Sequence, residues 1–574
     1  MEYRKTYEDW LNSEYFDEET KAELRSIADD DNEIKERFYT DLVFGTAGLR
    51  GIIGAGTNRM NIYTVRKATQ GLANYILEVG AADRGVAIAY DSRNMSPEFA
   101  DEAALCLNAN GIKAYVYDSL RATPQLSYAV RELNCIAGIN ITASHNPAEY
   151  NGYKVYWEDG AQITPPHDEN IMDRVKAVVD WAAVKTMNKE DAVSKGLYNI
   201  IDTSLDDKYM ETLKALVLRQ DCIDEYSKDI KIVYSPLNGT GNIPVRRVLK
   251  ELGFENVYVV KEQEMPDGNF TTVGYPNPES KAAFKMALDL AKEKDADLVL
   301  ATDPDADRLG VYAKDTKTGE YMALTGNMSG SLLAEYELSQ VAASRGIPSD
   351  GAVIKTIVTS NLVDEIAKAY NVKLIEVLTG FKYIGQQILG FEKSGVGEYL
   401  FGFEESYGCL IGTHARDKDA IVATMALCEA AAYYKSQGKT LWDAMVDMYE
   451  KYGYYVDDII SITLSGIEGL EKIQTILNNL RENPPSRIGK YEVLKARDYQ
   501  LDVIKDLKTG ETTTTGLPKS NVLYYECEGN VWACVRPSGT EPKIKVYFGV
   551  VGSSIEDANK LSAEFKEEVE KLLG

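Results

Sequence analysis

The chain alternates short apolar runs with helical stretches, and this alternation restricts its fold more than any other feature. The runs at 86–90, 113–117 and 136–142 have the composition of strands that are buried on both faces. Residues 96–110, between the first two runs, have helical spacing, and Ser96, followed by a proline, is expected to cap this helix. Such alternation predicts α/β domains with largely parallel sheets.

The same pattern starts again twice and then changes. Further strands are expected within 231–241, 255–260, 296–303, 352–360 and 373–380. A helical stretch at 419–451 precedes a different ending, which comprises apolar runs at 454–464 and 533–550 and a charged helix at 554–573. A chain of 574 residues has room for about three to five domains. We expect four, at 1–200 (with 1–40 as an exposed helical lead-in), 201–318, 319–453 and 454–574.

Charge and cysteine usage exclude several classes of protein. The 63 basic and 89 acidic residues give a net charge of −26, which disfavours nucleic acid and membrane surfaces as partners. Neither a secretory signal nor an apolar run long enough to span a bilayer is found. The seven cysteines are scattered without a CxxC pair, so we expect reduced thiols and a cytoplasmic protein.

A polar loop, Thr-Ala-Ser-His-Asn-Pro at 142–147, follows the run at 136–142. Loops at the carboxyl ends of strands are where α/β sheets bind ligands. Ser144, with His145 beside it and Lys154 ten residues later, is a candidate nucleophile or phosphate carrier in an exposed loop. The spacing alone also fits a plain polar turn that precedes an edge strand.

Three aspartates, Asp303, Asp305 and Asp307, follow another buried run. If the intervening proline keeps the loop extended, carboxylates at i, i+2 and i+4 project to one side and can reach one hard cation. An EF-hand is excluded, because Arg308 and Lys314 stand where that motif needs Gly and Glu. A solvated acidic turn is the alternative, but mutual repulsion of three carboxylates favours a Mg²⁺ site.

An acidic loop bracketed by glycines at 402–408 contains Glu404 and Ser406, which can hold sugar hydroxyls. Upstream, Thr379 and Lys382 lie in a loop that is punctuated by glycines. Taken alone, the acidic loop fits a solvated turn equally well. Downstream, Arg416 and Lys418 are cations in a chain that has few, although an ordinary surface charge cluster also explains them.

A fourth loop, at 536–547, combines hydroxyls, glycine and cations, which is the set that a phosphate dianion needs. Its candidate ligands are Arg536, Ser538, Gly539, Thr540, Lys543 and Lys545. A P-loop is disfavoured, because the Gly-Lys-Thr at 438–440 has Tyr433 where the first glycine is required. A plain β-turn remains an alternative for this segment alone. The arginines of two further turns, Arg50 and Arg93, are weak additional signals.

The four loops, in this order, resemble the signature loops of the α-D-phosphohexomutases, the superfamily of phosphoglucomutases and phosphomannomutases. The resemblance runs from about residue 40 to the end, and its pattern is most similar to the branch of bacterial phosphoglucomutases and phosphopentomutase-like enzymes. It implies an α/β protein of four domains around a central cleft, with three mixed α/β sheet domains and a smaller C-terminal α+β domain.

The resemblance also implies roles for individual residues. Ser144 would carry a phosphoryl group, and Asp303, Asp305 and Asp307 would bind Mg²⁺ together with an oxygen of that phosphoserine. The residues implied to assist at the reacting centre are Lys154, His145 and Lys418. The residues implied to contact the substrate are Arg50, Arg308, Thr379, Gly380, Lys382, Glu404, Ser406, Arg536, Ser538, Gly539, Thr540 and Lys545. Many relatives have arginine where Lys545 stands, so its phosphate contact is expected to be single rather than forked.

The implied reaction interconverts glucose 1-phosphate and glucose 6-phosphate through a phosphoserine enzyme and glucose 1,6-bisphosphate. This assignment makes the protein an intramolecular phosphotransferase whose partners are sugar phosphates, as a monomer or a homodimer. A phosphopentomutase, which acts on ribose or deoxyribose phosphates, is the alternative within the superfamily. A phosphomannomutase is less favoured, because the Glu-Glu-Ser of the sugar loop resembles glucose-specific members. A sugar-phosphate phosphatase is the alternative from another class.

Overall fold

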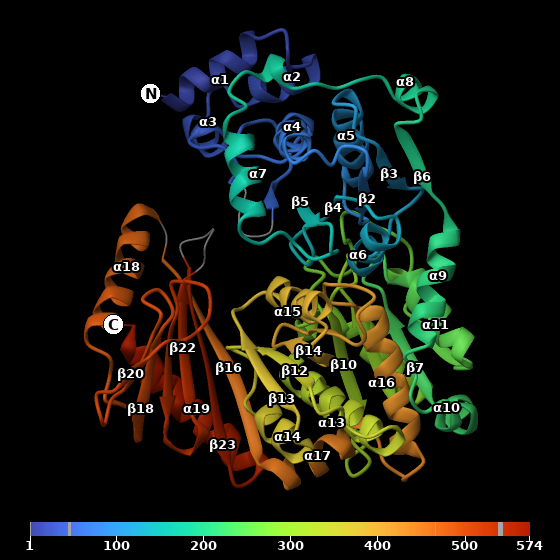
Figure 1. Ribbon diagram of the computed structural model, residues 1–574, viewed down its shortest axis with the longest axis vertical. Helices are drawn as coiled ribbons and strands as arrows, with labels where there is room; N and C mark the ends of the chain where they lie inside the picture. The colour runs from blue at the N-terminus through green and yellow to red at the C-terminus, as the bar shows by residue number, and fades with distance from the viewer. Residues whose placement is uncertain (1, 44–47, 465, 538–542, 574) are drawn as a thin grey trace. The chain divides into compact units, whose positions relative to one another are not determined.

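The computed structural model describes residues 2–43, 48–464, 466–537 and 543–573 (Figure 1). Its internal contacts divide the chain into two compact units. The first unit comprises Met1–Tyr312, Gly385–Lys393 and Gly408–Tyr433, and the second comprises Ala313–Ile384, Ser394–Tyr407 and Tyr434–Gly574. The chain therefore passes repeatedly from one unit to the other.

The first unit begins with three helices, α1 (Glu2–Asn12), α2 (Glu18–Ser26) and α3 (Asp31–Phe38). The helical character of this lead-in is confirmed, but the expectation that it is exposed is wrong. Trp10 is buried and stacks on Phe16 with ring centroids 4.0 Å apart, and both contact Tyr63 at the start of α4 (Ile62–Glu78). The aromatic side chains alternate with charged ones, so one face of this lead-in packs while the other remains in water.

The first sheet has the order β1-β5-β4-β2-β3-β6. Its strands are β1 (Gly48–Ile52), β2 (Val86–Tyr90), β3 (Ala114–Tyr117), β4 (Ala137–Ile141), β5 (Tyr150–Trp157) and β6 (Tyr198–Ile201). Strands β4, β2, β3 and β6 are parallel to one another, while β5 runs antiparallel to β4 and β1. The helices of this region are α4, α5 (Ser96–Ala109), α6 (Thr123–Glu132), α7 (His167–Lys176) and α8 (Lys189–Ser194). The three buried strands expected here are confirmed.

The start of α5 differs from the expectation. The cap position is Met95, in the left-handed region at φ 64°, and it makes no side-chain capping bond. Ser96 is instead the first helical residue, and its hydroxyl donates to Asp91 Oδ1 at 2.8 Å. The predicted Ser96 cap is therefore wrong, because a buried carboxylate takes the hydroxyl that would have bonded the helix backbone.

A second sheet of the first unit includes the order β10-β9-β7-β8, in which β7 is parallel to both β8 and β9. The strands are β7 (Lys231–Ser235), β8 (Asn256–Val259), β9 (Leu298–Thr302) and β10 (Leu309–Lys314). The accompanying helices are α9 (Thr203–Lys214), α10 (Gln220–Tyr226), α11 (Asn242–Leu252) and α12 (Lys285–Lys294). Strand β15 (Gly408–Leu410) and most of helix α16 (Ala420–Lys435) also belong to this unit.

In the second unit, β12 (Gly351–Thr356) lies between β13 (Lys373–Val377) and β14 (Glu398–Glu404) and is parallel to both. Helix α13 (Gly326–Ser344) begins two residues after β11 (Tyr321–Leu324), and the other helices of this region are α14 (Leu362–Tyr370) and α17 (Leu441–Tyr452). Helix α15 (Phe381–Ser394) begins in this unit, but its residues Gly385–Lys393 belong to the first. Parallel strands that alternate with helices thus recur for a third time, as the sequence pattern predicts.

The C-terminal part of the second unit is a different structure, an antiparallel sheet in the order β16-β23-β22-β21-β18-β19-β20, with β17 paired to β18. Its strands are β16 (Tyr454–Thr463), β17 (Arg487–Ile488), β18 (Tyr491–Asp498), β19 (Val503–Asp506), β20 (Thr512–Thr513), β21 (Leu523–Cys527), β22 (Trp532–Pro537) and β23 (Lys543–Gly552). Helices α18 (Gly466–Glu482) and α19 (Ile555–Leu572) pack on it through a core that includes Leu477, Phe548 and Phe565 (Figure 1).

Three mixed α/β sheets and a C-terminal α+β region confirm the predicted fold class. The four domain boundaries stay a prediction. All seven cysteines are free and buried, as their scattered positions indicate. Among the helices that the structure describes, none is both long enough and apolar enough to cross a bilayer.

Asp457 on β16 provides a test of this C-terminal packing. Its Oδ1 atom is buried without a hydrogen-bond partner among the described residues, and burial raises its pKa to about 6, although Lys355 attracts its charge. Because the folded-state pKa lies above the ordinary value, the native protein keeps a proton that the unfolded chain loses between about pH 4 and 6. The free energy of unfolding therefore falls as the pH rises through this window.

We expect Asp457→Asn to remove that fall, which amounts to at most about 3 kcal/mol. The melting temperature of the variant relative to the wild type should rise between pH 5 and pH 7.5, because only the wild type buries a charge at the higher pH. Asp458→Asn, a change at the exposed neighbour, is the matched control and should show no such rise. An equal pH dependence for all three proteins would contradict the prediction.

Candidate active site

Ser144 lies in the loop after β4, with its backbone in the left-handed region at φ 52°. Its Oγ donates to Asp303 Oδ2 at 2.9 Å and lies 3.1 Å from His145 Nδ1. The residue is 3% exposed, so the expected position at a strand's carboxyl end is confirmed but the expected exposure is wrong. The turn that carries Asp303 covers the hydroxyl, so residues 159 positions apart in the chain are in direct contact.

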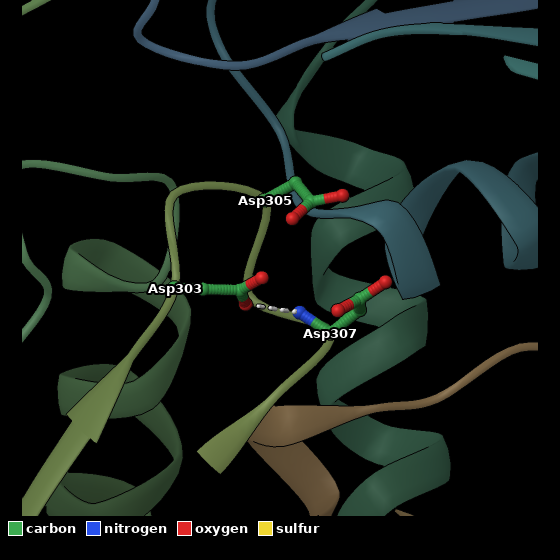
Figure 2. A group of neighbouring side chains, drawn as sticks. All are labelled: Asp303, Asp305 and Asp307. Carbon is green, nitrogen blue, oxygen red and sulfur yellow. Dashed lines mark hydrogen bonds between the residues drawn. The ribbon is translucent and has the colours of Figure 1, made fainter. Parts of the chain in front are cut away.

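The three aspartates lie between β9 and β10, and their carboxylate oxygens lie within 4.8 Å of one another (Figure 2). They converge for a different reason than expected. The loop is a tight turn with Ala306 at φ 51°, rather than an extended segment, and Asp303 Oδ1 accepts hydrogen bonds from the backbone N–H groups of Asp307 and Arg308 at 3.1 and 3.0 Å. The prediction that all three face one point is confirmed.

This group suits a hard cation. Atoms Oδ1 of Asp305 and Asp307 are buried and have no hydrogen-bond partner among the described residues. Burial and the neighbouring carboxylates of Asp307 and Asp305 hold the pKa of Asp303 well above its ordinary value. Buried carboxylate oxygens without donors are costly unless a cation neutralises them, and a divalent metal does this best.

Two lysines supply part of the compensating charge. Lys154 Nζ lies 2.8 Å from Asp305 Oδ2 and 3.8 Å from Asp307 Oδ2, and Lys418 Nζ lies 3.2 Å from Asp307 Oδ2. Burial acts to lower the pKa of Lys154, but Asp305 outweighs it and the pKa is raised. Burial likewise acts to raise the pKa of Asp305, and Lys154 outweighs it and holds the pKa below its ordinary value. Both groups of this pair are therefore charged at neutral pH.

A different structural feature positions each of the two lysines. Lys154 lies on β5 opposite Asn140 of β4, so the antiparallel pairing of these strands places it beside the strand that precedes Ser144. Lys418 lies in the turn before α16, which is buried rather than an ordinary surface charge cluster. Asp419 begins that helix by accepting the backbone N–H groups of Ile421 and Val422 at 2.9 and 3.0 Å.

Three further predicted residues surround Ser144. Arg50 Nη1 donates to Asn146 Oδ1 at 3.1 Å, and Arg308 Nε lies 3.8 Å from Asp307 Oδ1. Burial, with the charges of Arg308 and Arg50, holds the pKa of His145 well below its usual range. The imidazole is therefore neutral at pH 7. Arg416, the other candidate cation of this unit, instead pairs with Glu392 at 2.8 Å.

The second unit holds the predicted sugar loop at the end of β14. Glu404 is buried, and Ser406 Oγ donates to its Oε1 at 3.3 Å. A Cβ on Gly326 would lie 2.1 Å from the carbonyl oxygen of Glu405, so only glycine at the start of α13 lets the loop pack this closely.

Thr379 and Gly380 follow β13, and Lys382 lies in the first turn of α15. Since β13 and β14 both run parallel to β12, this loop and the Glu404 loop both follow the carboxyl ends of their strands, on the same side of the sheet. Gly380 has φ 119°, which explains the glycine, and Thr379 Oγ1 is buried without a hydrogen-bond partner among the described residues. The second unit thus brings these two predicted loops together.

The predicted phosphate loop connects β22 and β23. Arg536 and Lys545 are directly opposed across these antiparallel strands, which puts two cations side by side at the base of the loop. Ser538, Gly539 and Thr540 lie outside the described residues.

One part of the site was missed by the sequence analysis, the loop 264–280 between β8 and β9. The Tyr275 ring lies edge-on to His145 with centroids 6.0 Å apart, and Glu279 accepts a hydrogen bond from Arg308 Nη1 at 2.6 Å. The available signal was the turn-rich sequence Pro-Asp-Gly-Asn-Phe followed by Pro-Asn-Pro-Glu. A long loop without secondary structure in a compact domain often has a function.

Comparisons with known proteins agree with this geometry. Sequence profiles for phosphoglucomutase/phosphomannomutase α/β/α domains I, II and III match residues 41–180, 207–318 and 325–452. A phosphoglucomutase of Staphylococcus saprophyticus is 37% identical over 525 residues, which cover 92% of this chain and 93% of that protein. The phosphoglucomutase of Staphylococcus aureus strain MRSA252 is 38% identical over 535 residues, with 93% and 94% covered. This chain belongs to the phosphoglucomutase/phosphomannomutase family.

Solved structures show the same fold at lower sequence identity. A phosphoglucomutase/phosphomannomutase family protein from Burkholderia thailandensis has a TM-score of 0.64 at 19% identity, covering 93% of this chain and 98% of that one. The open form of the Paramecium phosphoglucomutase pp63/parafusin has a TM-score of 0.67 at 18% identity, covering 92% and 96%. The family fold therefore extends over nearly the whole chain.

Removing one carboxylate charge tests the aspartate group as a cation site. We expect Asp307→Asn to weaken binding of Mg²⁺ at least about tenfold, because one of three charged ligands is lost. Isothermal titration of the full-length protein with MgCl₂ measures this. Asp202→Asn is the control, because Asp202 caps α9 and asparagine caps equally well. Unchanged Mg²⁺ affinity in Asp307→Asn would place the cation elsewhere.

Proposed function

We propose that this protein is a phosphoglucomutase, which interconverts glucose 1-phosphate and glucose 6-phosphate through a phosphoserine at position 144. The observation that carries the proposal is the contact between Ser144 Oγ and the Asp303 carboxylate, inside a group of three aspartates and two lysines. Phosphoryl transfer requires in-line positioning and neutralised charge more than covalent chemistry, and the lysines and cation-binding carboxylates of this group are equipped to neutralise charge. Nearly full-length relatives that are phosphoglucomutases support the choice of substrate.

In the proposed reaction, phosphorylated Ser144 gives its phosphoryl group to the 6-hydroxyl of glucose 1-phosphate. The resulting glucose 1,6-bisphosphate turns over, and its 1-phosphoryl group returns to Ser144. Asp303, Asp305 and Asp307 would hold Mg²⁺, which supplies positive charge to the transferring group when bound. Lys154 is charged at neutral pH, so we assign it to stabilising the developing charge rather than to accepting a proton.

The neutral His145 has a different role in this proposal. Its Nδ1 lies 3.1 Å from Ser144 Oγ, and its lowered pKa leaves the ring able to accept a proton at pH 7. We assign it to receiving the hydroxyl proton of Ser144 as the phosphoryl group returns. Lys418, 3.2 Å from Asp307, balances the remaining carboxylate charge.

The second unit supplies recognition in this proposal. Glu404 and Ser406 would bind sugar hydroxyls, since a carboxylate can accept two hydrogen bonds from one sugar ring. Thr379, Gly380 and Lys382 would line the same end of the sheet. Arg536 and Lys545, with Ser538, Gly539 and Thr540, would hold the phosphate that is not being transferred. Arg50 and Arg308 complete the set as contacts from the first unit.

The mass of the peptide that contains Ser144 tests directly whether this serine is phosphorylated. The protein is incubated with glucose 1,6-bisphosphate, with and without Mg²⁺, and then exposed to glucose 1-phosphate or ribose 1-phosphate. We expect a Mg²⁺-dependent phosphate that glucose 1-phosphate removes faster than ribose 1-phosphate. Faster removal by ribose 1-phosphate would make the protein a phosphopentomutase. A bare Ser144 in active protein, with stoichiometric release of inorganic phosphate, would make it a phosphatase.

Ser144→Ala should reduce mutase turnover at least about 1000-fold, because the phosphoryl carrier is lost. The fold should persist, since the substitution removes a hydroxyl and adds no volume to a packed loop. Coupled assay of glucose 6-phosphate formation and a melting curve measure the two effects. Turnover near the wild-type value would rule out the phosphoserine mechanism.

Glu404→Gln should raise KM for glucose 1-phosphate about tenfold, because a neutral amide accepts fewer hydrogen bonds from sugar hydroxyls. Phosphorylation of Ser144 by the bisphosphate, measured at saturation, should change little. Glu398→Gln is the control, because Glu398 is the first residue of the same strand and its side chain is partly exposed. Loss of phosphorylation in Glu404→Gln would instead place Glu404 among the residues that act on the phosphoryl group.

A further inference from the structure

Arg93 lies in the turn after β2 and is almost completely buried, at 1% exposure. A buried arginine normally needs a carboxylate or several acceptors for its five N–H groups. Its sequence context marks it only as an arginine that follows a strand. Its side chain packs against the loop that carries Ser144.

The guanidinium donates hydrogen bonds to four backbone carbonyl oxygens of that loop and the strand after it. Nη2 donates to the carbonyl oxygens of Ser144, at 2.6 Å, and Asn146. Nη1 donates to those of Pro147 and Tyr150, at 2.8 and 3.0 Å. A single side chain therefore spans the whole turn, from the reacting serine to the beginning of β5.

Arg93 is itself held from two sides. Its Nε lies 3.3 Å from Asp91 Oδ2, and its guanidinium carbon lies 5.0 Å from the centroid of the Phe270 ring. Asp91 also accepts the hydroxyl of Thr142 at 2.6 Å, and Thr142 Oγ1 accepts the backbone N–H of Ser144 at 2.8 Å. The backbone N–H and C=O groups of Ser144 thus both connect to the Asp91–Arg93 turn.

This support matters because the Ser144 backbone is in an unfavourable conformation. Its φ of 52° is uncommon for a residue other than glycine, and such conformations persist where the surroundings hold them. The conformation directs Oγ toward Asp303. The planar fork of arginine can bond four carbonyls at once, whereas the single ammonium of lysine cannot.

We propose that Arg93 is a positioning residue for phosphoryl transfer at Ser144, which it serves by fixing the backbone that aims Oγ at the aspartate group. This inference rests on the function proposed above. In the step concerned, the bond from phosphorus to the sugar oxygen breaks and a bond to Oγ forms, and the hydroxyl proton of Ser144 passes by way of His145 to the sugar oxygen. Arg93 makes no contact with the reacting atoms and acts through the loop.

The test compares Arg93→Lys with Arg59→Lys in the full-length protein. Arg59 is a buried arginine of the same unit that also bonds backbone carbonyl oxygens, those of Glu36 and Asn58 at 3.4 and 3.2 Å, in a different turn. Four quantities are measured: the rate at which glucose 1,6-bisphosphate phosphorylates Ser144, the kcat for glucose 1-phosphate, the KM for glucose 1-phosphate, and the melting temperature.

For Arg93→Lys we expect the phosphorylation rate and kcat to fall about 100-fold, because displacing a reacting group by about 1 Å has an effect of that size. KM should stay within about threefold, since the loops that recognise the substrate are unchanged. Arg59→Lys should also lower the melting temperature but keep kcat within about threefold. Wild-type rates in Arg93→Lys, or equal losses of kcat in both variants, would overturn the proposal.

If Arg93→Lys does not fold, Asp91→Asn decides the question, because it removes the charge that orients Arg93 and so loosens its four carbonyl bonds, while an amide oxygen at position 91 can still accept the hydroxyl of Thr142. Its phosphorylation rate should fall at least about tenfold with KM unchanged, and a wild-type rate would overturn the proposal. Measuring phosphorylation of Ser144 in the wild type distinguishes a failure of this inference from a failure of the function on which it rests. A wild-type Ser144 that is never phosphorylated contradicts the proposed function, whereas equal phosphorylation of wild type and Arg93→Lys contradicts only the role of Arg93.

Discussion

Repulsion among three buried carboxylates is the constraint on which the site depends. Asp303, Asp305 and Asp307 have oxygens within 4.8 Å of one another, and burial removes the water that would screen them. Two lysines offset part of this charge, and the Oδ1 atoms of Asp305 and Asp307 still have no hydrogen-bond donor in the part of the chain that the structure describes. A protein that gained only stability from this turn would do better with apolar residues, so the cost indicates a function that needs concentrated negative charge.

The same constraint explains why Ser144 is buried. A hydroxyl that donates to Asp303 satisfies one buried carboxylate oxygen and is thereby kept in the place where charge is concentrated. The loop reaches this position because Arg93 and Thr142 bond its backbone on both sides. The position of the Ser144 hydroxyl is therefore supported by hydrogen bonds to backbone groups as well as by its own bond to Asp303.

Several features could be predicted from the sequence because they depend on local pattern. The buried strands before Ser144 and before Asp303 are continuous apolar runs, and parallel strands place their polar loops at one edge of each sheet. The Ser96 cap and the extended aspartate loop were wrong because, in each case, a carboxylate a few residues away forms hydrogen bonds that the apolar pattern does not predict. Asp91 takes the Ser96 hydroxyl, and Asp303 folds its own turn by accepting backbone N–H groups.

The sequence by itself determined the fold class, the order of the functional loops and the residues in them, since apolar periodicity and turn chemistry act over a few residues. The tertiary structure alone decided which of these residues meet. Lys154 lies ten residues from Ser144 in the chain but faces Asp305, and Lys418 reaches Asp307 from more than a hundred residues away. Such contacts depend on strand pairing and on the burial of charge, and neither can be evaluated until distant segments are packed together.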